Sequence, residues 1–281
     1  MGIKTPYVSE IAKNTYAINE FGLTAMYLLV GDESALLIDT GCGACDLKGL
    51  VARLTDKSYR VVLTHGHLDH AGGIGAFDEV YLGEGDFEMA ADIDTEELRN
   101  YLDTLGNMGG YDVYDYTRDN VQKPTKLPNM IGIHDGDRFE LGNRSVLAIE
   151  VPGHTKGGIC FLDEKTQIMF SGDACNCNLL VMGTSVNTAL RGLDYLKTYD
   201  GRYQQMYNGH IGYAGIPTCL SLPESTLDDC IHIMETILDG TAVIEKVPFL
   251  GGENTCASYG TSRVSFDPER LIDEGETPRK L

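Results

Sequence analysis

The sequence predicts an α/β protein whose two similar halves pack as one unit. Short apolar runs bounded by turn residues, typical of buried strands, alternate with longer stretches whose apolar residues recur at helical spacing. The order of strands, helix, strands and helix occurs in each half of the chain. No strong boundary and no short-period repeat interrupts the 281 residues, so we expect one domain over residues 1–281.

The first half is predicted to begin with strands and to end with a long helix. Apolar runs separated by turn residues predict strands at Tyr16–Ile18, Ala25–Val30, Ala35–Asp39 and Tyr59–Leu63. Three leucines and Val51 share one face of a helix predicted over Asp46–Leu54. A second helical stretch covers about Asp86 to Leu105.

The second half repeats this order. Two hairpins are predicted, and their strands are Arg138–Leu141 with Ser145–Val151, and Ile159–Leu162 with Ile168–Phe170. Helices are expected over Thr188–Thr198 and Glu224–Leu238, on either side of the short apolar run Met206-Tyr207. The tail after Gly240 is strand-like and irregular.

Residues 106–128 differ from both halves, because they hold paired glycines, several tyrosines and little apolar periodicity. Loops of this length in compact domains are often functional, so we expect a lid inserted around 106–128. Its candidate substrate contacts are Tyr111, Tyr114 and Tyr116. Tyrosines that simply pack in a loop are the alternative.

Charge and composition narrow the class of partner. With 42 acidic and 22 basic residues the net charge is −20, which opposes nucleic acid and anionic membranes but not a small-molecule substrate. The N-terminal residues lack an apolar signal core, and no apolar stretch is long enough to span a membrane. We therefore expect a cytoplasmic protein with reduced cysteines. The oligomeric state is not predicted, and a homodimer is one alternative.

Three of the seven histidines fall in one short motif, His65-x-His67-x-Asp69-His70, directly after a predicted strand. In extended backbone, residues two apart face the same side, so the first two imidazoles can point together. The turn that follows can bring Asp69 and His70 to a second point nearby. Imidazole and carboxylate are good ligands for zinc, iron or manganese, so the motif predicts a metal site.

Three further candidates, His154, Asp173 and His210, each follow an apolar strand and a glycine, which is how a fold presents ligands along one sheet edge. His134 and His232 are expected to be structural or solvated. Lys156 could attract a substrate carboxylate, although a solvated lysine is common. The cysteines of Cys42-x-x-Cys45 and Cys175-x-Cys177 are interpreted as small buried hydrophobes, with metal binding or redox pairing as alternatives.

In this order and these contexts, the motifs resemble those of the metallo-β-lactamase superfamily, and Asp39 in Leu37-Ile38-Asp39-Thr40-Gly41 matches an upstream motif. The resemblance covers roughly Tyr16 to His210. It implies a four-layer αββα sandwich with metals at one edge of two sheets. It also implies one metal on His65, His67 and His154 and a second on Asp69, His70 and His210. Asp173 would bridge them, and Asp39 would orient a ligand.

The function implied by the resemblance is that of a binuclear metal-dependent hydrolase of a small thioester, ester or lactone, similar to glyoxalase II and the acyl-homoserine lactonases. Two divalent cations, zinc before iron or manganese, would hold a bridging hydroxide that attacks the carbonyl carbon, and Asp69 would be the catalytic residue that shuttles a proton. True β-lactamases of the family usually lack an aspartate where Asp173 stands. A mononuclear iron oxidoreductase of the persulfide dioxygenase type and a metal-retaining binding or sensor protein remain alternatives.

Overall fold

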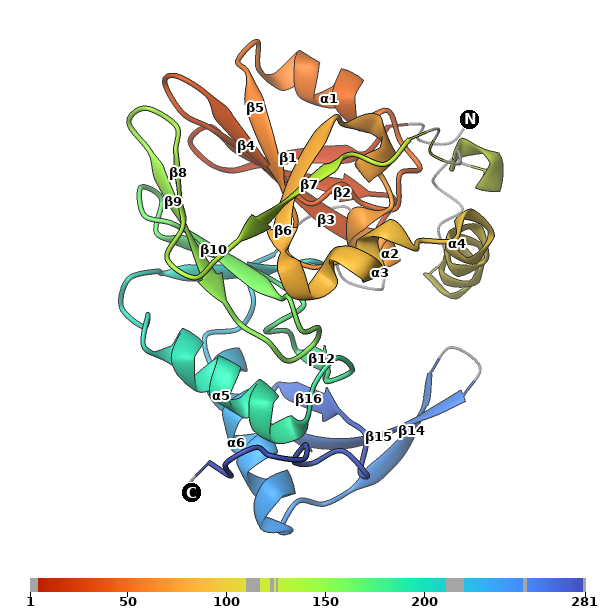
Figure 1. Ribbon diagram of the computed structural model, residues 1–281, viewed down its shortest axis with the longest axis vertical. Coiled ribbons are helices and arrows are strands. Elements are labelled where there is room, and N and C mark those ends of the chain that lie inside the picture. The colour runs from red at the N-terminus through yellow and green to blue at the C-terminus, as the bar shows by residue number, and fades with distance from the viewer. Residues whose placement is uncertain are drawn as a thin grey trace.

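A computed structural model describes residues 5–109, 117–121, 124, 126–210, 220–249 and 252–279, and two β-sheets form its centre (Figure 1). The first sheet has seven strands in chain order: β1 (Tyr7–Ala12), β2 (Thr15–Glu20), β3 (Thr24–Val30), β4 (Ala35–Ile38), β5 (Tyr59–Val62), β6 (Glu79–Gly83) and β7 (Asn129–Ile133). Strands β1 to β4 are antiparallel neighbours, whereas β4 to β7 run parallel.

The second sheet has five strands in the order β13-β11-β10-β9-β8. Their bounds are β8 (Arg138–Glu140), β9 (Ser145–Glu150), β10 (Ile159–Asp163), β11 (Ile168–Gly172) and β13 (Gln205–Asn208). The two predicted hairpins, β8-β9 and β10-β11, are both present. Strand β13 joins β11 in parallel, so both carboxyl ends lie at the same edge of the sheet.

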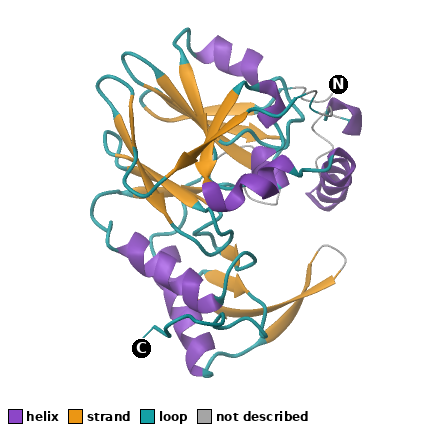
Figure 2. Ribbon diagram, viewed as in Figure 1, coloured by secondary structure: helices purple, strands orange, loops and turns teal. Residues whose placement is uncertain are grey.

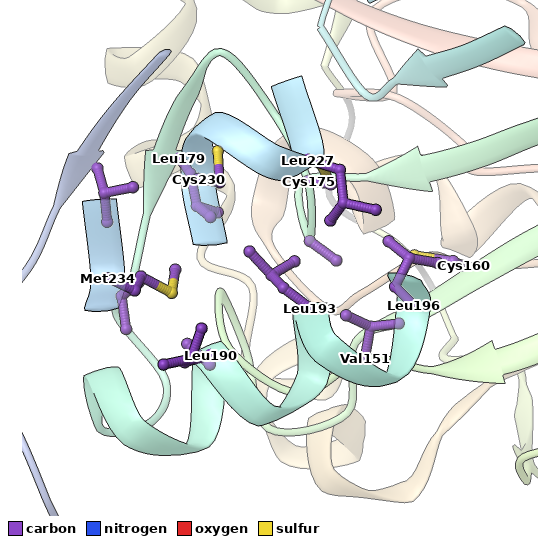
Figure 3. Packing of buried hydrophobic residues seen from close by; sticks show 14 of the residues in the cluster. Val151, Cys160, Cys175, Leu179, Leu190, Leu193, Leu196, Leu227, Cys230 and Met234 are labelled. Carbon is purple, nitrogen blue, oxygen red and sulfur yellow. The ribbon is translucent and has the colours of Figure 1, made fainter. Parts of the chain in front are cut away.

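Helices cover the outer faces of both sheets. The inner faces share one core, where the rings of Tyr27 and Phe170 lie 4.6 Å apart between centroids. Helices α1 (Leu47–Leu54), α2 (Leu68–Ala71) and α3 (Phe87–Ala91) pack on the first sheet. Helices α5 (Val186–Lys197) and α6 (Thr226–Asp239) pack on the second, and Figure 3 shows the leucines between them. The predicted four-layer αββα sandwich is therefore confirmed.

The strand-like tail after Gly240 contributes three strands of a third sheet, ordered β12-β16-β15-β14. The fourth strand is β12 (Asn178–Leu180), and the tail supplies β14 (Glu245–Phe249), β15 (Gly252–Tyr259) and β16 (Ser262–Ser265). Strands β15 and β16 contact α6, while the β14-β15 hairpin projects beyond the helices (Figure 2). The chain then returns to α5, where Glu276 accepts hydrogen bonds from the side chains of Ser185 and Asn187.

The prediction of one continuous helix over Asp86–Leu105 is wrong. The chain forms α3 and then α4 (Thr95–Gly109), with a break at residues 92–94. Asp94 causes the break, because its Oδ1 accepts the backbone N–H groups of Glu96 and Glu97 at 2.8 Å each and so starts a new helix. Single-turn 3₁₀ helices occur at η1 (Ile74–Ala76), η2 (Glu84–Asp86) and η4 (Arg118–Asn120).

The expected lid is described only in part. Residues 106–109 are the last turn of α4, and η4 is fastened to that helix by Arg99, whose guanidinium donates to the Val121 carbonyl at 2.7 Å. Arg118 also pairs with Asp103 on α4 at 2.7 Å. Residues 110–116, 122–123 and 125 lie outside the described part of the chain, and with them Tyr111, Tyr114 and Tyr116.

Candidate metal centre

The seven candidate ligands lie at one edge of the two sheets, where several strands end. The two sheets are joined there, since the Ile159 N–H donates to the Thr64 carbonyl at 2.8 Å. Within the second sheet the Gly209 N–H donates to the Gly172 carbonyl at 3.0 Å. These bonds bring the ends of β5, β11 and β13 together, together with the loop that follows β9.

The ligand atoms form the two triads expected from the sequence. One consists of His65, His67 and His154, and the other of Asp69, His70 and His210. A third grouping, His65, His70 and Asp173, overlaps both. Within each group the ligand atoms lie within 4.8 Å of one another.

Asp173 stands between the triads. Its Oδ2 lies 2.9 Å from His210 Nε2 and 3.6 Å from His154 Nε2, so one carboxylate reaches a histidine of each triad. The same oxygen is 3.9 Å from His70 Nε2. One carboxylate oxygen thus lies close to histidines of both triads.

Four of the five histidines have their Nδ1 atom held by an oxygen of the chain. The pairs are His65 with Thr64 Oγ1 (3.0 Å), His70 with Asp39 Oδ2 (3.1 Å), His154 with the Leu180 carbonyl (2.6 Å) and His210 with the Leu23 carbonyl (2.9 Å). Thr64 gives its hydroxyl hydrogen to Asp39, so its oxygen accepts from His65. These acceptors assign the hydrogen to Nδ1 and turn each Nε2 lone pair toward the centre.

Several of these inward atoms have no hydrogen-bond donor among the residues that the structure describes. His65 Nε2, His70 Nε2 and Asp173 Oδ1 are buried without a partner. His67 Nδ1 and His154 Nε2 face each other at 2.9 Å, although the Leu180 carbonyl already occupies the hydrogen of His154. Buried acceptors that converge in this way are rare unless a cation lies between them. The donor set therefore fits divalent metals that accept nitrogen and carboxylate ligands.

The electrostatics favour the neutral form of two of the histidines and the ionised form of both aspartates. Burial, with help from neighbouring histidines, keeps the pKa of His65 well below its ordinary value and lowers the pKa of His67 to about 4. Burial alone would raise the pKa of Asp173, but the surrounding histidines outweigh it and the pKa lies well below the ordinary range. The pKa of Asp69 is lowered in the same way by His70 and His210. His65 and His67 are therefore neutral and both carboxylates are ionised. Burial alone would lower the pKa of His70, but Asp69, Asp173 and Asp39 outweigh it and raise that pKa above its ordinary value.

Asp39 supports the centre from behind and adopts a strained backbone conformation. Its φ is 63°, which is uncommon for a residue other than glycine. Its carboxylate accepts from the Thr64 N–H at 2.7 Å, from the Thr64 hydroxyl at 2.8 Å and from His70 Nδ1 at 3.1 Å. Strain persists where the surroundings over-determine a residue, and here the result is a fixed orientation for His70.

The glycines beside the ligands are required by close approach. A Cβ on Gly209 would lie 2.4 Å from Cε1 of His70, and one on Gly172 would lie 2.5 Å from Cβ of Thr64. Gly172 also has a φ of 51°, which glycine adopts readily. Side chains at either position would push the strand ends apart.

Two supporting residues were not expected from the sequence. Asp86, fully buried in η2, accepts from the Gly66 N–H at 3.0 Å, the Thr155 hydroxyl at 2.6 Å and the Gly157 N–H at 2.8 Å. It thereby ties the loop of His65 and His67 to the loop of His154. On the other side, the Tyr101 hydroxyl donates to Asp69 Oδ2 at 2.7 Å.

The sequence gives only a weak indication that Tyr101 faces the protein interior. Tyr101 lies three residues after Leu98 and therefore on the same helix face as that leucine. That spacing indicates a face turned toward the protein but does not name the partner. Asp86 had no usable signal, because an acidic residue at the start of an apparent helix is ordinary.

The remaining candidates lie apart from the ligand groups. Lys156 is exposed, and together with the stronger effect of Arg270 it lowers the pKa of Asp273. His134 is exposed, and the ring of His232 packs against that of Tyr259, with centroids 4.1 Å apart and ring planes inclined by 52°. Both agree with a structural or solvated role.

The cysteines of the two short motifs are free thiols. Cys42 and Cys175 are buried, whereas Cys45 and Cys177 are partly exposed. Burial and the nearby Glu20 carboxylate raise the pKa of Cys42 well above its ordinary value. Among the described residues, the groups able to hold a metal contain histidine and aspartate but no cysteine.

Together, the fold and the site define an αββα protein with a cluster of histidines and aspartates at the sheet edge that could hold metal ions. A sequence model of the metallo-beta-lactamase superfamily matches residues 19–176, more than half of the chain. The chain belongs to the metallo-beta-lactamase superfamily.

Curated relatives include two proteins named as thioesterases. The chain is 30% identical over 196 residues to the atrochrysone carboxyl ACP thioesterase dmxR1 of Cryptosporiopsis sp. (strain 8999), an alignment that covers 68% of this chain and 48% of the relative. It is also 30% identical over 164 residues to the acyl-coenzyme A thioesterase MBLAC2 of Homo sapiens, covering 53% of this chain and 57% of that protein. The chain thus spans about half the length of the curated relatives it matches.

Solved structures agree on the fold. A metallo-beta-lactamase family protein from Thermus thermophilus has a TM-score of 0.56 and 21% identity, with 82% of each chain covered. A metallo-beta-lactamase from Pontibacter korlensis has a TM-score of 0.59 and 16% identity, with 82% of this chain and 99% of that chain covered. In the described part of this chain, every helix is too short or too polar to cross a lipid bilayer.

Proposed function

We propose that this protein is a metal-dependent hydrolase of acyl thioesters that uses two divalent cations, most simply zinc, with iron or manganese as alternatives. One observation carries the proposal: two complete ligand triads lie on either side of Asp173, whose Oδ2 reaches a histidine of each. The inward lone pairs of His65 and His70, which lack a donor among the described residues, support cation binding at this place.

Bound there, the cations would supply Lewis acidity for the carbonyl oxygen and lower the pKa of a coordinated water. The residues of the chain would position the ligands. Oxygen atoms of Asp39, Thr64, Leu23 and Leu180 fix the histidine rings, so little reorganisation is needed during the reaction. Asp69 is the proposed catalytic carboxylate, because its Oδ1 faces the centre, 3.7 Å from His70 Nε2, while its Oδ2 accepts the hydroxyl of Tyr101.

The preference for thioesters over esters and lactones rests on the relatives. The curated proteins with about 30% identity carry thioesterase names, one for acyl-coenzyme A and one for an acyl carrier protein. Both substrates join an acyl group to a thiol, so the shared chemistry is attack at a thioester carbonyl. A thiolate leaving group also needs less protonation than an alkoxide, because thiols are much more acidic than alcohols.

A combined metal and substrate assay tests the function. Purified protein, stripped with a chelator and reloaded separately with zinc, manganese or iron, is assayed on short acyl-coenzyme A esters, oxygen esters, lactones and a phosphodiester. We expect two equivalents of metal and fastest turnover on the thioesters. One equivalent of iron with oxygen consumption would instead favour the persulfide dioxygenase alternative, and full metal loading without turnover would favour a binding or sensor role.

We also propose that residues 1–281 act as one unit in which residues 106–128 set substrate choice. Support comes from the attachment of η4 to α4, the helix that also carries Tyr101. Replacing Tyr111, Tyr114 and Tyr116 together by alanine should change the ratio of KM values between acyl chains while metal content stays the same. Equal KM ratios in the variant and the wild type would remove the lid from the proposal.

A reducing, cytoplasmic setting is proposed as well. It is supported by the seven cysteines that the structure describes, all of which are free thiols. The net charge of −20 supports a small-molecule substrate over anionic polymers. Cell fractionation with an antibody to the protein tests the compartment, and recovery in an exported fraction would contradict it.

A further inference from the structure

The second triad has an unusual support, because one of its ligands is held by a helix outside both sheets. Asp69 and His210 are ligands of this triad, and the Tyr101 hydroxyl of α4 donates to Asp69 Oδ2 at 2.7 Å. The Asp69 carboxylate therefore accepts a hydrogen bond from a residue of α4. The histidines, by contrast, are anchored mostly by oxygens of the strand ends and their loops.

Helix α4 is docked by a small separate core. Its buried leucines, Leu98 and Leu102, pack in a cluster with Phe21, Leu23, Cys42, Ala44 and Val121, and the ring of Tyr101 packs against the same cluster. Leu23 belongs to this cluster and also provides the carbonyl that accepts the Nδ1–H of His210. The α4 docking site therefore contacts the supports of two ligands of the second triad at once.

The geometry at Asp69 divides the work of its two oxygens. Oδ2 accepts the phenol of Tyr101 and lies 3.6 Å from His210 Nε2. Oδ1 lies 3.7 Å from His70 Nε2 and is left to face the centre. A carboxylate on a short helix can rotate, and a hydrogen bond to one oxygen selects the orientation in which the other can ligate.

We propose that Tyr101 is a positioning residue for the second half-site, and that its phenol sets the cation affinity of the triad Asp69, His70 and His210 by fixing the Asp69 carboxylate. The inference rests on the proposed function, because it requires cations at both triads. It assigns to α4 a role in the binding of the second cation, through the bond from Tyr101 to Asp69.

Cobalt titration of the chelator-stripped protein tests the proposal, with the visible absorption of the bound ion as readout and a chromophoric chelator as competitor. For Tyr101→Phe we expect the first equivalent to bind as in the wild type. The second should bind about 10- to 100-fold more weakly, the usual effect of removing a partner that orients a ligand. At saturating cobalt, KM for a thioester should change less than the cobalt concentration needed for half-maximal turnover.

Tyr81→Phe is the matched control. Tyr81 also donates to a carboxylate, Glu79 Oε1, at 2.8 Å, but on the partly exposed strand β6. The control should bind both cobalt equivalents like the wild type. Tyr101→Leu, which also lacks a donor but keeps an apolar side chain in the helix, tests the same bond if the phenylalanine variant does not fold, and thermal unfolding of the stripped proteins establishes which variants fold.

The possible failures can be told apart. If the wild type itself binds only one cobalt, the two-cation function is wrong, and the role of Tyr101 falls with it. If the wild type binds two and a folded Tyr101 variant binds two with unchanged affinities, the proposed function stands and the positioning role is refuted. Equal weakening of both equivalents would also refute it, because it would indicate a general loss of structure.

Discussion

Asp86 offers the sharpest test of how the first triad, His65, His67 and His154, is held in place. This buried carboxylate accepts three hydrogen bonds, from the backbone of Gly66 and Gly157 and from the hydroxyl of Thr155. Gly66 separates His65 from His67 in the sequence, and the other two donors closely follow His154. One side chain therefore holds together the loops that carry all three ligands of the first triad.

The size of the effect follows from the geometry of the bonds. In Asp86→Asn, the amide oxygen can take the place of Oδ2 and keep the bonds from Gly66 and Thr155, but the amide nitrogen then faces the N–H of Gly157. One charge-assisted bond is lost and two donors oppose each other, so we expect the free energy of unfolding to fall by about 2–3 kcal/mol. Asp86→Ala leaves all three donors without their acceptor and should cost about 4 kcal/mol or more.

Urea unfolding of the chelator-stripped protein, followed by circular dichroism, measures this loss. Asp78→Asn is the control, because that carboxylate pairs with Lys126 at an exposed site where a salt bridge contributes little. A competition titration then measures the first cation, whose affinity should fall in Asp86→Asn. Unfolding at the wild-type urea midpoint, together with an unchanged first affinity, would refute the argument.

Three further outcomes are expected. Asp173→Ala should lose one metal and most turnover, because it removes the carboxylate shared by both triads, whereas Cys175→Ser should keep both; metal analysis of the two variants decides. Burial raises the pKa of Glu20 above its ordinary 4.5, so the folded state binds this proton more tightly, and the stability of the wild type relative to Glu20→Gln should fall as the pH rises above that value. A pH-independent difference would contradict this. Asp163→Ala should lower the free energy of unfolding by about 3–5 kcal/mol, because it leaves the buried guanidinium of Arg144 without its ion-pair partner. The double variant Arg144→Met/Asp163→Leu removes both charges and should lose less stability in urea unfolding. An equal loss of stability in the double variant would contradict this cause.

The sequence was sufficient where local pattern and local chemistry coincide. The apolar runs Ala25–Val30 and Ile159–Leu162 correspond to β3 and β10, because buried strands must be apolar on both faces. The ordering of His65, Asp173 and His210 after strands placed these side chains at one edge, because the carboxyl ends of parallel strands meet there. The resemblance to a known superfamily supplied the layer order that pattern alone left open.

What the sequence could not predict depends on contacts between distant residues. The bond from Thr155 to Asp86 joins positions 69 residues apart, and the bond from Tyr101 to Asp69 joins positions 32 apart. The break before α4 was missed for a different reason. Asp94 competes with the helix for the N–H groups of Glu96 and Glu97, which apolar periodicity does not register.

These supports differ in kind, and the two half-sites should therefore differ in resilience. The first triad is clamped by Asp86 between loops of the two main sheets, whereas the second depends on α4, which packs through the small cluster around Leu98 and Leu102. Local unfolding begins where few apolar contacts hold an element. Urea below the main transition should release the second cation first and leave the first bound. Spectroscopic cobalt titration at increasing urea tests this order, and simultaneous loss of both cations with the global transition would show that α4 is as firmly docked as the sheets.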